Sequence, residues 1–288
     1  MPEIQGHRGA RALRPENTLP GLAHALAVGV DAIEFDVTLT ADGGLILAHD
    51  LTVDATTITG SGDYVGRRWA DLTLAQVATL DAGYRRPPEP FEATFVPVPG
   101  TGVPTLGQVC RLIAEAGAAE VTLAVELKTD ASWPAADVAR LADGALATLA
   151  AHGLTRQARI LAFDWRVLRA ARAGDESVPR VALIEPRTWA QGSPWLAGQD
   201  TAAGMAVAAR GIGAAWLSPW DPLTSADLVA ETHREGLRIV PWTVNEPDRM
   251  GALIEYGVDA IVTDRPDVLR GVFAERGHTL PRRYDIRS

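Results

Sequence analysis

The sequence has almost no cysteine and no long apolar segment, and each absence excludes a class of protein. Cys110 is the only cysteine among 288 residues, so no intrachain disulfide can form. Its apolar neighbours Val109, Leu112 and Ile113 indicate a thiol in the core. No uninterrupted apolar run reaches the roughly 18 residues that suggest a membrane-spanning helix. We therefore expect a soluble, cytoplasmic protein with no stable membrane insertion.

The sequence also lacks an excess of positive charge. It has 27 Lys and Arg against 36 Asp and Glu, a formal net charge of −9, which argues against nucleic acid or an anionic membrane as the main partner. The first residues, Met1 to His7, contain no basic region followed by an apolar stretch, so no signal peptide is predicted. We expect a small molecule as the partner, and the sequence leaves the oligomeric state open.

Short apolar strands alternate with helical stretches over most of the chain. The apolar patterns predict strands at Ile4–His7, Ile33–Leu39, Val121–Leu127, Arg159–Phe163, Val181–Ile184, Ala215–Ser218, Ile239–Val244 and Ala260–Thr263. Helices are predicted at Thr18–Ala27, Leu106–Glu115, Ala135–Ala151, Trp165–Ala173, Thr201–Ala209, Ala226–Glu235, Pro247–Tyr256 and Pro266–Arg276. Thr105 with Gln108 has the capping-box pattern, and Pro247 suits a first helical turn. Repeated strand–helix pairs of this kind favour an α/β fold, a closed (β/α)₈ barrel of TIM type spanning residues 1–288.

One segment interrupts this alternation. After Leu45–Leu47 the chain has a turn-rich run at 54–66, a helix-like stretch at Thr73–Ala78 and a proline-rich stretch at 87–104. Proline restricts both helices and central strands, and structureless loops beyond about 15 residues are uncommon. We therefore interpret residues 50–104 as a small subdomain inserted after the second strand region, on the side of the barrel mouth.

Three carboxylates recur at strand spacing. Glu34 and Asp36 alternate with apolar residues in one strand, and Glu126 lies in a second. Residues two apart in a strand share a face, so Glu34 and Asp36 point the same way. Buried acids cost several kcal/mol each unless a cation or donor compensates them. A hard divalent cation on carboxylate oxygens, one ion in all, is the interpretation that this pattern favours.

Basic residues accompany these acids. His7 and Arg8 follow the first strand, His49 follows Leu45–Leu47, and Lys128 follows Glu126. Two imidazoles near two fixed cations and a metal suit a phosphodiester, because the cations hold phosphoryl oxygens and the imidazoles exchange protons near neutral pH. The C-terminal ends of barrel strands gather at one mouth, so we expect these side chains to converge there.

The motifs, taken in order, resemble the glycerophosphodiester phosphodiesterase family over almost the whole chain. The matching segments are His7-Arg8-Gly9, Pro15-Glu16-Asn17-Thr18, Glu34-Phe35-Asp36-Val37, His49-Asp50, Thr59-Gly60, Leu80-Asp81-Ala82-Gly83, Val103-Pro104-Thr105-Leu106, Glu126-Leu127-Lys128, Trp242-Thr243-Val244-Asn245 and Gly257 to Asp264. The resemblance implies a (β/α)₈ barrel with an inserted subdomain, and a divalent cation, Ca²⁺ or Mg²⁺. It also implies hydrolysis of glycerophosphodiesters to glycerol 3-phosphate and an alcohol.

The resemblance further implies a role for each matching residue. The metal ligands would be Glu34, Asp36 and Glu126, the acid/base pair His7 and His49, and the phosphate contacts Arg8 and Lys128. Two alternatives stay open at this stage. One is a phospholipase D-like phosphodiesterase that acts on lysolipids, and the other is a non-catalytic phosphodiester-binding barrel.

Other polar and aromatic residues have interpretations of their own. Trp242 ends a strand, where its ring is expected to contact the substrate. Asn17 and Glu16 are interpreted as caps of the first helix, without a chemical role. Asp264, which precedes Arg265 and Pro266, is interpreted as a cap or a local ion-pair partner.

Overall fold

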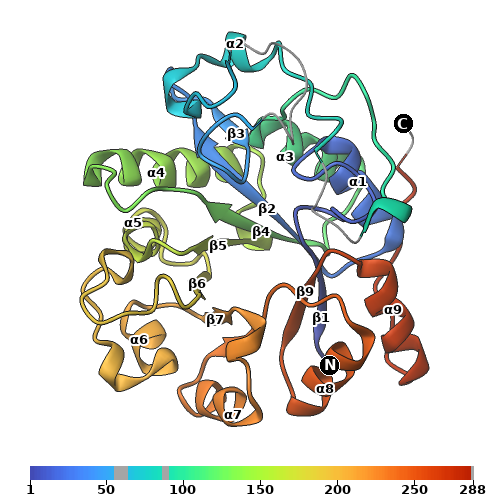
Figure 1. The fold of residues 1–288 in the computed structure, drawn as a ribbon, viewed down its shortest axis with the longest axis vertical. Helices are drawn as coiled ribbons and strands as arrows, with labels where there is room; N and C mark the ends of the chain where they lie inside the picture. Colours follow the sequence, from blue (N-terminus) through green and yellow to red (C-terminus); the bar gives the residue numbers. More distant parts are fainter. Residues whose placement is uncertain (55–63, 86–90, 287–288) are drawn as a thin grey trace.

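The strands form a nearly closed parallel barrel. The computed structural model describes residues 1–54, 64–85 and 91–286. The parallel strands are β1 (Glu3–Gly6), β2 (Ala32–Leu39), β4 (Thr122–Leu127), β5 (Ala158–Ala162), β6 (Arg180–Ile184), β7 (Trp216–Pro219), β8 (Arg238–Ile239) and β9 (Ala260–Thr263). They are hydrogen-bonded in the order β8-β7-β6-β5-β4-β2-β1-β9 (Figure 1). Backbone bonds from Asp259 N to Ile239 O (3.0 Å) and from Val262 N to Pro241 O (3.0 Å) join the two ends.

Helices cover the outside of the barrel, as Figure 1 shows. The longer ones are α1 (Leu19–Val28), α3 (Leu106–Glu115), α4 (Ala135–Ala151), α5 (Trp165–Gly174), α6 (Met205–Gly211), α7 (Ala226–Arg234), α8 (Pro247–Tyr256) and α9 (Pro266–Glu275). The shorter ones are α2 (Leu74–Val77), η2 (Trp69–Asp71), η3 (Phe91–Ala93), η4 (Thr155–Gln157), η5 (Pro194–Leu196), η6 (Thr201–Ala203) and η7 (Asp221–Leu223). The predicted (β/α)₈ barrel is confirmed. None of the helices in the described part of the chain is long and apolar enough to cross a membrane.

Several predicted helix ends are confirmed. Thr105 and Gln108 form the complete capping box of α3, and Pro247 stands in the first turn of α8. Gly257 ends α8 in the left-handed conformation at φ 84°, which costs glycine little because it has no Cβ. The predicted helix Thr201–Ala209 instead divides into η6 and α6. Gly204, at φ 92°, separates the two.

The two faces of each strand pack into different layers. Ile33, Phe35 and Val37 of β2 belong to the large apolar cluster between the strands and the helices. Ala124 of β4 and Leu161 of β5 belong to a second cluster that fills the barrel interior. Because strand side chains alternate, the residues between the first three, Glu34 and Asp36, face the interior. All eight residues of β2 are buried, so these acids lie inside the protein.

The predicted strand Ile239–Val244 is shorter in the structure, where β8 is Arg238–Ile239. Pro241 has no N–H and cannot continue the ladder on both sides. The segment nevertheless keeps its direction, since Trp242 pairs with Trp220 in an isolated parallel bridge and Val244 N donates to Val262 O at 2.9 Å. This extension brings Trp242 to the barrel mouth.

The segment between β2 and α3 departs from the barrel pattern. It begins with β3 (Leu45–Leu47), which pairs antiparallel with β2. Buried apolar residues here form a cluster of their own: Ile46, Ala48, Val53, Trp69, Leu72, Val77, Leu80, Ala82 and Val103. The expected Thr59-Gly60 motif and parts of the expected runs at 54–66 and 87–104 lie outside the described residues. An inserted subdomain at 50–104 stays a prediction.

Candidate active site at the barrel mouth

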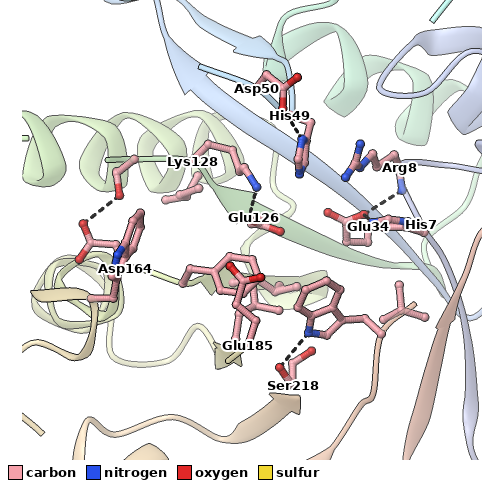
Figure 2. Close-up of a pocket in the computed structure, with 18 of the residues that line it drawn as sticks. His7, Arg8, Glu34, His49, Asp50, Glu126, Lys128, Asp164, Glu185 and Ser218 are labelled. Atoms are coloured by element: carbon pink, nitrogen blue, oxygen red, sulfur yellow. Dashed lines mark hydrogen bonds and ion pairs between the residues drawn. The ribbon is translucent and has the colours of Figure 1, made fainter. Parts of the chain in front are cut away.

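A cavity of about 530 Å³ opens at the C-terminal ends of the strands (Figure 2). All but one of the predicted site residues line it, the exception being Asp36, which is two residues after Glu34 in β2. The lining residues from the acid and base set are His7, Arg8, Glu34, His49, Glu126, Lys128 and Trp242. Others come from β7, from the ends of β5 and β6, and from the connection after β6, namely Phe163, Asp164, Glu185, Arg187, Trp195 and Ser218. The structure therefore brings together residues from β1, β2, β3, β4 and the segment after β8.

The three predicted metal ligands form one compact cluster. One oxygen from each of Glu34, Asp36 and Glu126 lies within 4.8 Å of the others. Asp36 and Glu126 are register partners on the adjacent strands β2 and β4, which explains the closeness. Glu34 Oε1 and Asp36 Oδ1 are buried and accept no hydrogen bond, with Lys128 Nζ 3.5 Å from the latter. Such orphaned carboxylate oxygens, in a set made of oxygen donors only, fit a hard divalent cation.

Burial and mutual repulsion shape the charges of this cluster. Burial, followed by the charges of Asp36 and Glu126, raises the pKa of Glu34 well above its ordinary value. Burial likewise raises the pKa of Glu126. Burial also opposes ionisation of Asp36, but the neighbouring Lys128, followed by other cations, holds its pKa below the usual range. Three ionised carboxylates are thus unfavourable together, and a cation among them would relieve the cost.

His7 forms a buried pair with Asp264. The ring Nδ1 lies 2.6 Å from Asp264 Oδ1, and Asp264 is only 1% exposed. An ionised carboxylate only accepts hydrogen bonds, so Nδ1 carries the proton and Nε2, 3.9 Å from Glu34 Oε2, is left as the acceptor. Burial lowers the pKa of His7 to about 4 against the opposing effect of Asp264, so the neutral imidazole is favoured.

Asp264 is the buried partner of His7 that the sequence interpretation missed. It is not a local cap, because besides His7 it contacts Arg11 Nε at 2.7 Å and Asn245 Nδ2 at 2.9 Å. The predicted closed barrel could have indicated this contact, because closure of a barrel places the last strand beside the first. Gly6 and Thr263 are register partners of β1 and β9, so the residues that follow them, His7 and Asp264, meet.

His49 has a comparable but more exposed partner. Its Nδ1 lies 2.7 Å from Asp50 Oδ1, at side-chain exposures of 36% and 53%. Trp69, from the segment between β3 and α3, donates its indole N–H to Asp50 O at 2.8 Å and holds this turn in place. Figure 2 shows His49 and His7 on different sides of the Glu126 and Glu34 carboxylates.

The two predicted phosphate contacts are held by carboxylates. Lys128 Nζ lies 2.6 Å from Glu126 Oε1. Burial alone would lower the pKa of Lys128, but the negative charge of Glu126, followed by that of Asp36, raises it above its ordinary value. Arg8 donates from Nη1 to Glu16 Oε1 at 2.9 Å, and its backbone N–H donates to Glu34 Oε2 at 2.8 Å. The Arg8 side chain is 11% exposed and Lys128 13%, so both keep a small face toward the cavity.

Asn17 and Glu16 have structural roles that differ from the expected caps. Thr18 caps α1, while Asn17 accepts from Asp36 N at 3.0 Å and donates from Nδ2 to Asp36 Oδ2 at 2.8 Å. Asn17 is in the left-handed region at φ 52°, which asparagine tolerates better than most residues. Arg85 lies behind it, 3% exposed, and donates from Nη1 to Asn17 O (3.2 Å) and Leu47 O (3.0 Å).

Trp242 lines the cavity as predicted, next to Phe163. Their ring centroids are 5.4 Å apart in an edge-to-face arrangement, and Trp242 Nε1 donates to Ser218 O at 3.1 Å. Lys128 Nζ stands 5.7 Å from the centre of the Phe163 ring. These contacts fix the aromatic wall opposite the β2 carboxylates.

Comparisons with known proteins all match this chain to glycerophosphodiester phosphodiesterases. Residues 7–268 match the model of the glycerophosphoryl diester phosphodiesterase family. A glycerophosphodiester phosphodiesterase of Caldanaerobacter subterraneus is 29% identical over 275 residues, which cover 95% of this chain and 98% of that protein. One of Bacillus subtilis is also 29% identical, covering 92% of this chain and 84% of that protein.

Solved structures show the same relationship. A crystal structure from Silicibacter pomeroyi, described as a glycerophosphoryl diester phosphodiesterase, superposes with a TM-score of 0.86 at 30% identity, covering 97% of this chain and 95% of that one. A phosphodiesterase of Oleispira antarctica, solved with its product sn-glycerol-3-phosphate, has a TM-score of 0.74 at 21% identity. The match covers 95% of this chain and 97% of that one. At that identity the second comparison concerns the fold alone.

Proposed function

Because the chain belongs to the glycerophosphoryl diester phosphodiesterase family, we propose that it hydrolyses glycerophosphodiesters to glycerol 3-phosphate and an alcohol. The observation that carries the proposal is one cavity that joins a carboxylate cluster, two histidines and two cations. The Oleispira antarctica relative was solved with glycerol 3-phosphate, the product expected here.

The proposed cofactor is one divalent cation, Ca²⁺ or Mg²⁺, held by Glu34, Asp36 and Glu126. Two buried oxygens without hydrogen bonds and the raised pKa of Glu34 support this assignment. When bound, the cation would neutralise phosphoryl charge and act as a Lewis acid. Arg8 and Lys128 are proposed to bind the phosphoryl oxygens from the neighbouring wall, and Trp242 to contact the organic part of the substrate.

His7 and His49 are proposed as the acid/base pair. Each has a carboxylate at Nδ1, so each directs its other nitrogen away from that partner and can exchange a proton there. One imidazole accepts the proton of the attacking hydroxyl, and the other donates a proton to the oxygen of the leaving alcohol. Asp264 and Asp50 are proposed as positioning residues that fix the ring orientation.

We propose that the attacking oxygen is the glycerol 2-hydroxyl. Its attack forms a cyclic phosphate and releases the alcohol, and water then opens the ring. An internal hydroxyl has a high effective molarity, which can supply about 7 kcal/mol of the barrier. A substrate analogue that lacks only the 2-hydroxyl should bind and not turn over. Turnover at the rate of the natural diester would instead indicate direct attack by water.

The lysolipid alternative finds little support on the segment between β3 and α3. Exposed aromatic rings on this segment would favour a lipid substrate, but Trp69 is buried at 2% exposure in its apolar cluster. Tyr84 is the more exposed ring at 39%. The non-catalytic alternative would require neither histidine, yet both are present with carboxylate partners.

The test is release of glycerol 3-phosphate from a panel of glycerophosphodiesters, with and without chelator, and after Ca²⁺ or Mg²⁺ is restored. We expect release that stops on chelation and returns with metal, and an increase in melting temperature on metal binding. Full turnover of a metal-free sample would contradict the carboxylate assignment. No release from any diester would contradict the proposed function.

A further inference from the structure

The cavity extends beyond the acid and base residues into a second region. At the end of β6 its wall consists of Glu185, Arg187 and Trp195, all in the connection between β6 and α6. In Figure 2, Glu185 projects from the end of β6 into the cavity, across from His49. None of the roles proposed above uses these three residues, although they share one continuous cavity with the carboxylate cluster.

The backbone holds Glu185 in place before any ligand binds. Thr188, which is completely buried, accepts from Glu185 N at 3.3 Å through its Oγ1, and its own N–H donates to Glu185 O at 3.0 Å. Trp189 packs beside Trp165 of α5, with ring centroids 6.4 Å apart. The start of this connection is therefore held by hydrogen bonds within its own turn and by packing against α5, which positions Glu185 before a ligand binds.

The Glu185 carboxylate already has a cation, but a weakly held one. Arg187 donates to Glu185 Oε1 from Nε at 3.0 Å and from Nη2 at 2.7 Å. Among the described residues no hydrogen bond reaches Oε2. The Arg187 side chain is 76% exposed, against 23% for Glu185, and exposed ion pairs contribute about 0–1 kcal/mol. A cation that enters the cavity can therefore replace Arg187 at small cost.

The surroundings favour an ammonium group over other cations. The Trp195 ring is half-buried and faces the same cavity, and ammonium ions bind well between a carboxylate and an aromatic face. Two other acids line the cavity nearby: Asp164 is 1% exposed and accepts from Arg166 and Thr129, and Asp130 accepts from the backbone N–H of Ser132 at 2.8 Å. Among the described residues that line the cavity in the connection after β6, Glu185 is thus the carboxylate that a ligand can reach.

We propose that Glu185 and Trp195 form a subsite for an ammonium-bearing alcohol leaving group of the choline or ethanolamine type, and that Arg187 is an internal cation which occupies Glu185 when no such group is bound. This inference rests on the proposed function and specifies the substrate class. It makes two opposite predictions for two neighbouring side chains. Removal of the carboxylate should weaken selection for cationic diesters, and removal of the guanidinium should strengthen it.

The experiment compares kcat/KM for glycerophosphocholine, glycerophosphoethanolamine and the uncharged-headgroup diester glycerophosphoglycerol. For Glu185→Gln we expect a loss on the order of tenfold with the two cationic diesters, the low end for a contact with a charged group, and little change with glycerophosphoglycerol. For Arg187→Gln we expect a gain of up to about fivefold with the cationic diesters. Tetramethylammonium should inhibit the wild type, Glu185→Gln less, and Arg187→Gln more.

Glu176→Gln is the matched control, since Glu176 also pairs with an arginine, Arg172 at 2.9 Å, but lies outside the cavity. It should leave all three diesters unchanged. Equal losses with all diesters in Glu185→Gln, or a loss with glycerophosphocholine in Arg187→Gln, would overturn the subsite. A wild type that hydrolyses none of the diesters would overturn the proposed function instead, so the two failures are distinguishable.

Discussion

The pair formed by His7 and Asp264 yields a sharp prediction for the variant Asp264→Asn. The carboxylate is almost completely buried and lies 2.6 Å from His7 Nδ1. Arg11 Nε forms an ion pair with the same carboxylate at 2.7 Å, and Asn245 Nδ2 donates to its Oδ2 at 2.9 Å. Asparagine keeps the size of the side chain but replaces one acceptor oxygen with an NH₂ donor. The neutral amide loses the ion pair with Arg11, and its single oxygen can face either His7 or Asn245 but not both.

The consequence for His7 follows from its tautomer. If the amide NH₂ faces the ring, Nδ1 must accept, and the proton moves to Nε2, the nitrogen nearest Glu34. The ring then presents a donor where an acceptor is needed. A positioned acid or base contributes about 10²–10⁴-fold, so we expect kcat to fall by that range, or roughly 3–5 kcal/mol of transition-state stabilisation. KM and metal affinity should change much less, because neither the proposed metal ligands nor the proposed phosphate contacts are altered.

The assay measures kcat and KM for glycerophosphocholine, with metal affinity by titration and the melting temperature by circular dichroism. Asp259→Asn is the matched control: Asp259 also pairs with a histidine, His233 at 2.9 Å, at the start of β9 and away from the cavity. The control should retain its activity. A folded Asp264→Asn protein with kcat within about threefold of the wild type would refute the role assigned to Asp264, since a tautomer change at an acid or base costs far more.

Four further predictions follow from individual contacts. Asp50→Asn should lower kcat less than Asp264→Asn does, because the His49 pair is more exposed, and the two kcat values measured side by side test this order. Glu126→Gln should weaken metal binding in a titration while circular dichroism stays native, and unchanged metal affinity would contradict its role as a ligand. Arg85→Met should lower the free energy of unfolding by about 1–3 kcal/mol, because the carbonyls of Asn17 and Leu47 lose their donor. It should also weaken metal binding, because Asn17 contacts Asp36. A loss of stability with unchanged metal affinity would limit Arg85 to a structural role. Trp216→Ala should lower the free energy of unfolding, measured with denaturant, by about 3–5 kcal/mol and leave kcat/KM unchanged. The Trp216 ring is buried at the end of the barrel away from the cavity, with the Arg159 guanidinium 4.1 Å from its centre. A loss of kcat/KM without a loss of stability would contradict this separation.

Much of the fold was predictable because barrel strands leave a strong local pattern. The apolar runs located β1, β2, β4, β5, β6, β7 and β9 to within a few residues. The predicted strand at Ile239–Val244 contains Pro241, whose missing N–H changes the hydrogen-bond ladder without changing the apolar pattern, and β8 accordingly ends at Ile239. Similarly, Gly204 divides the predicted helix at 201–209, an effect of backbone conformation that apolar periodicity does not register.

The carboxylate cluster was predictable for a different reason. Glu34 and Asp36 share a face because they are two apart in a strand, and this follows from the sequence alone. Glu126 joins them because β2 and β4 are adjacent, which the barrel implies. Local spacing plus one topological rule was therefore sufficient. The pairing of Lys128 with Glu126 needs only the local spacing, because the two residues are two apart at the end of β4 and share a face.

The residues that support this cluster could not be derived in the same way. Asp264, Asn17 and Arg85 each look like an ordinary cap or loop residue in their own segment, and what defines them is a partner far away in the chain. The contact of Asp264 with His7 could have been predicted from barrel closure, because closure pairs β9 with β1. Arg85 could not, since it comes from a segment without apolar periodicity and its partners are backbone carbonyls, which carry no sequence signal. A strand pattern thus specifies which groups face the cavity, whereas the shell that orients them is specified only by the completed fold. For this reason the variants of Asp264 and Arg85 test the structure more stringently than variants of the motif residues.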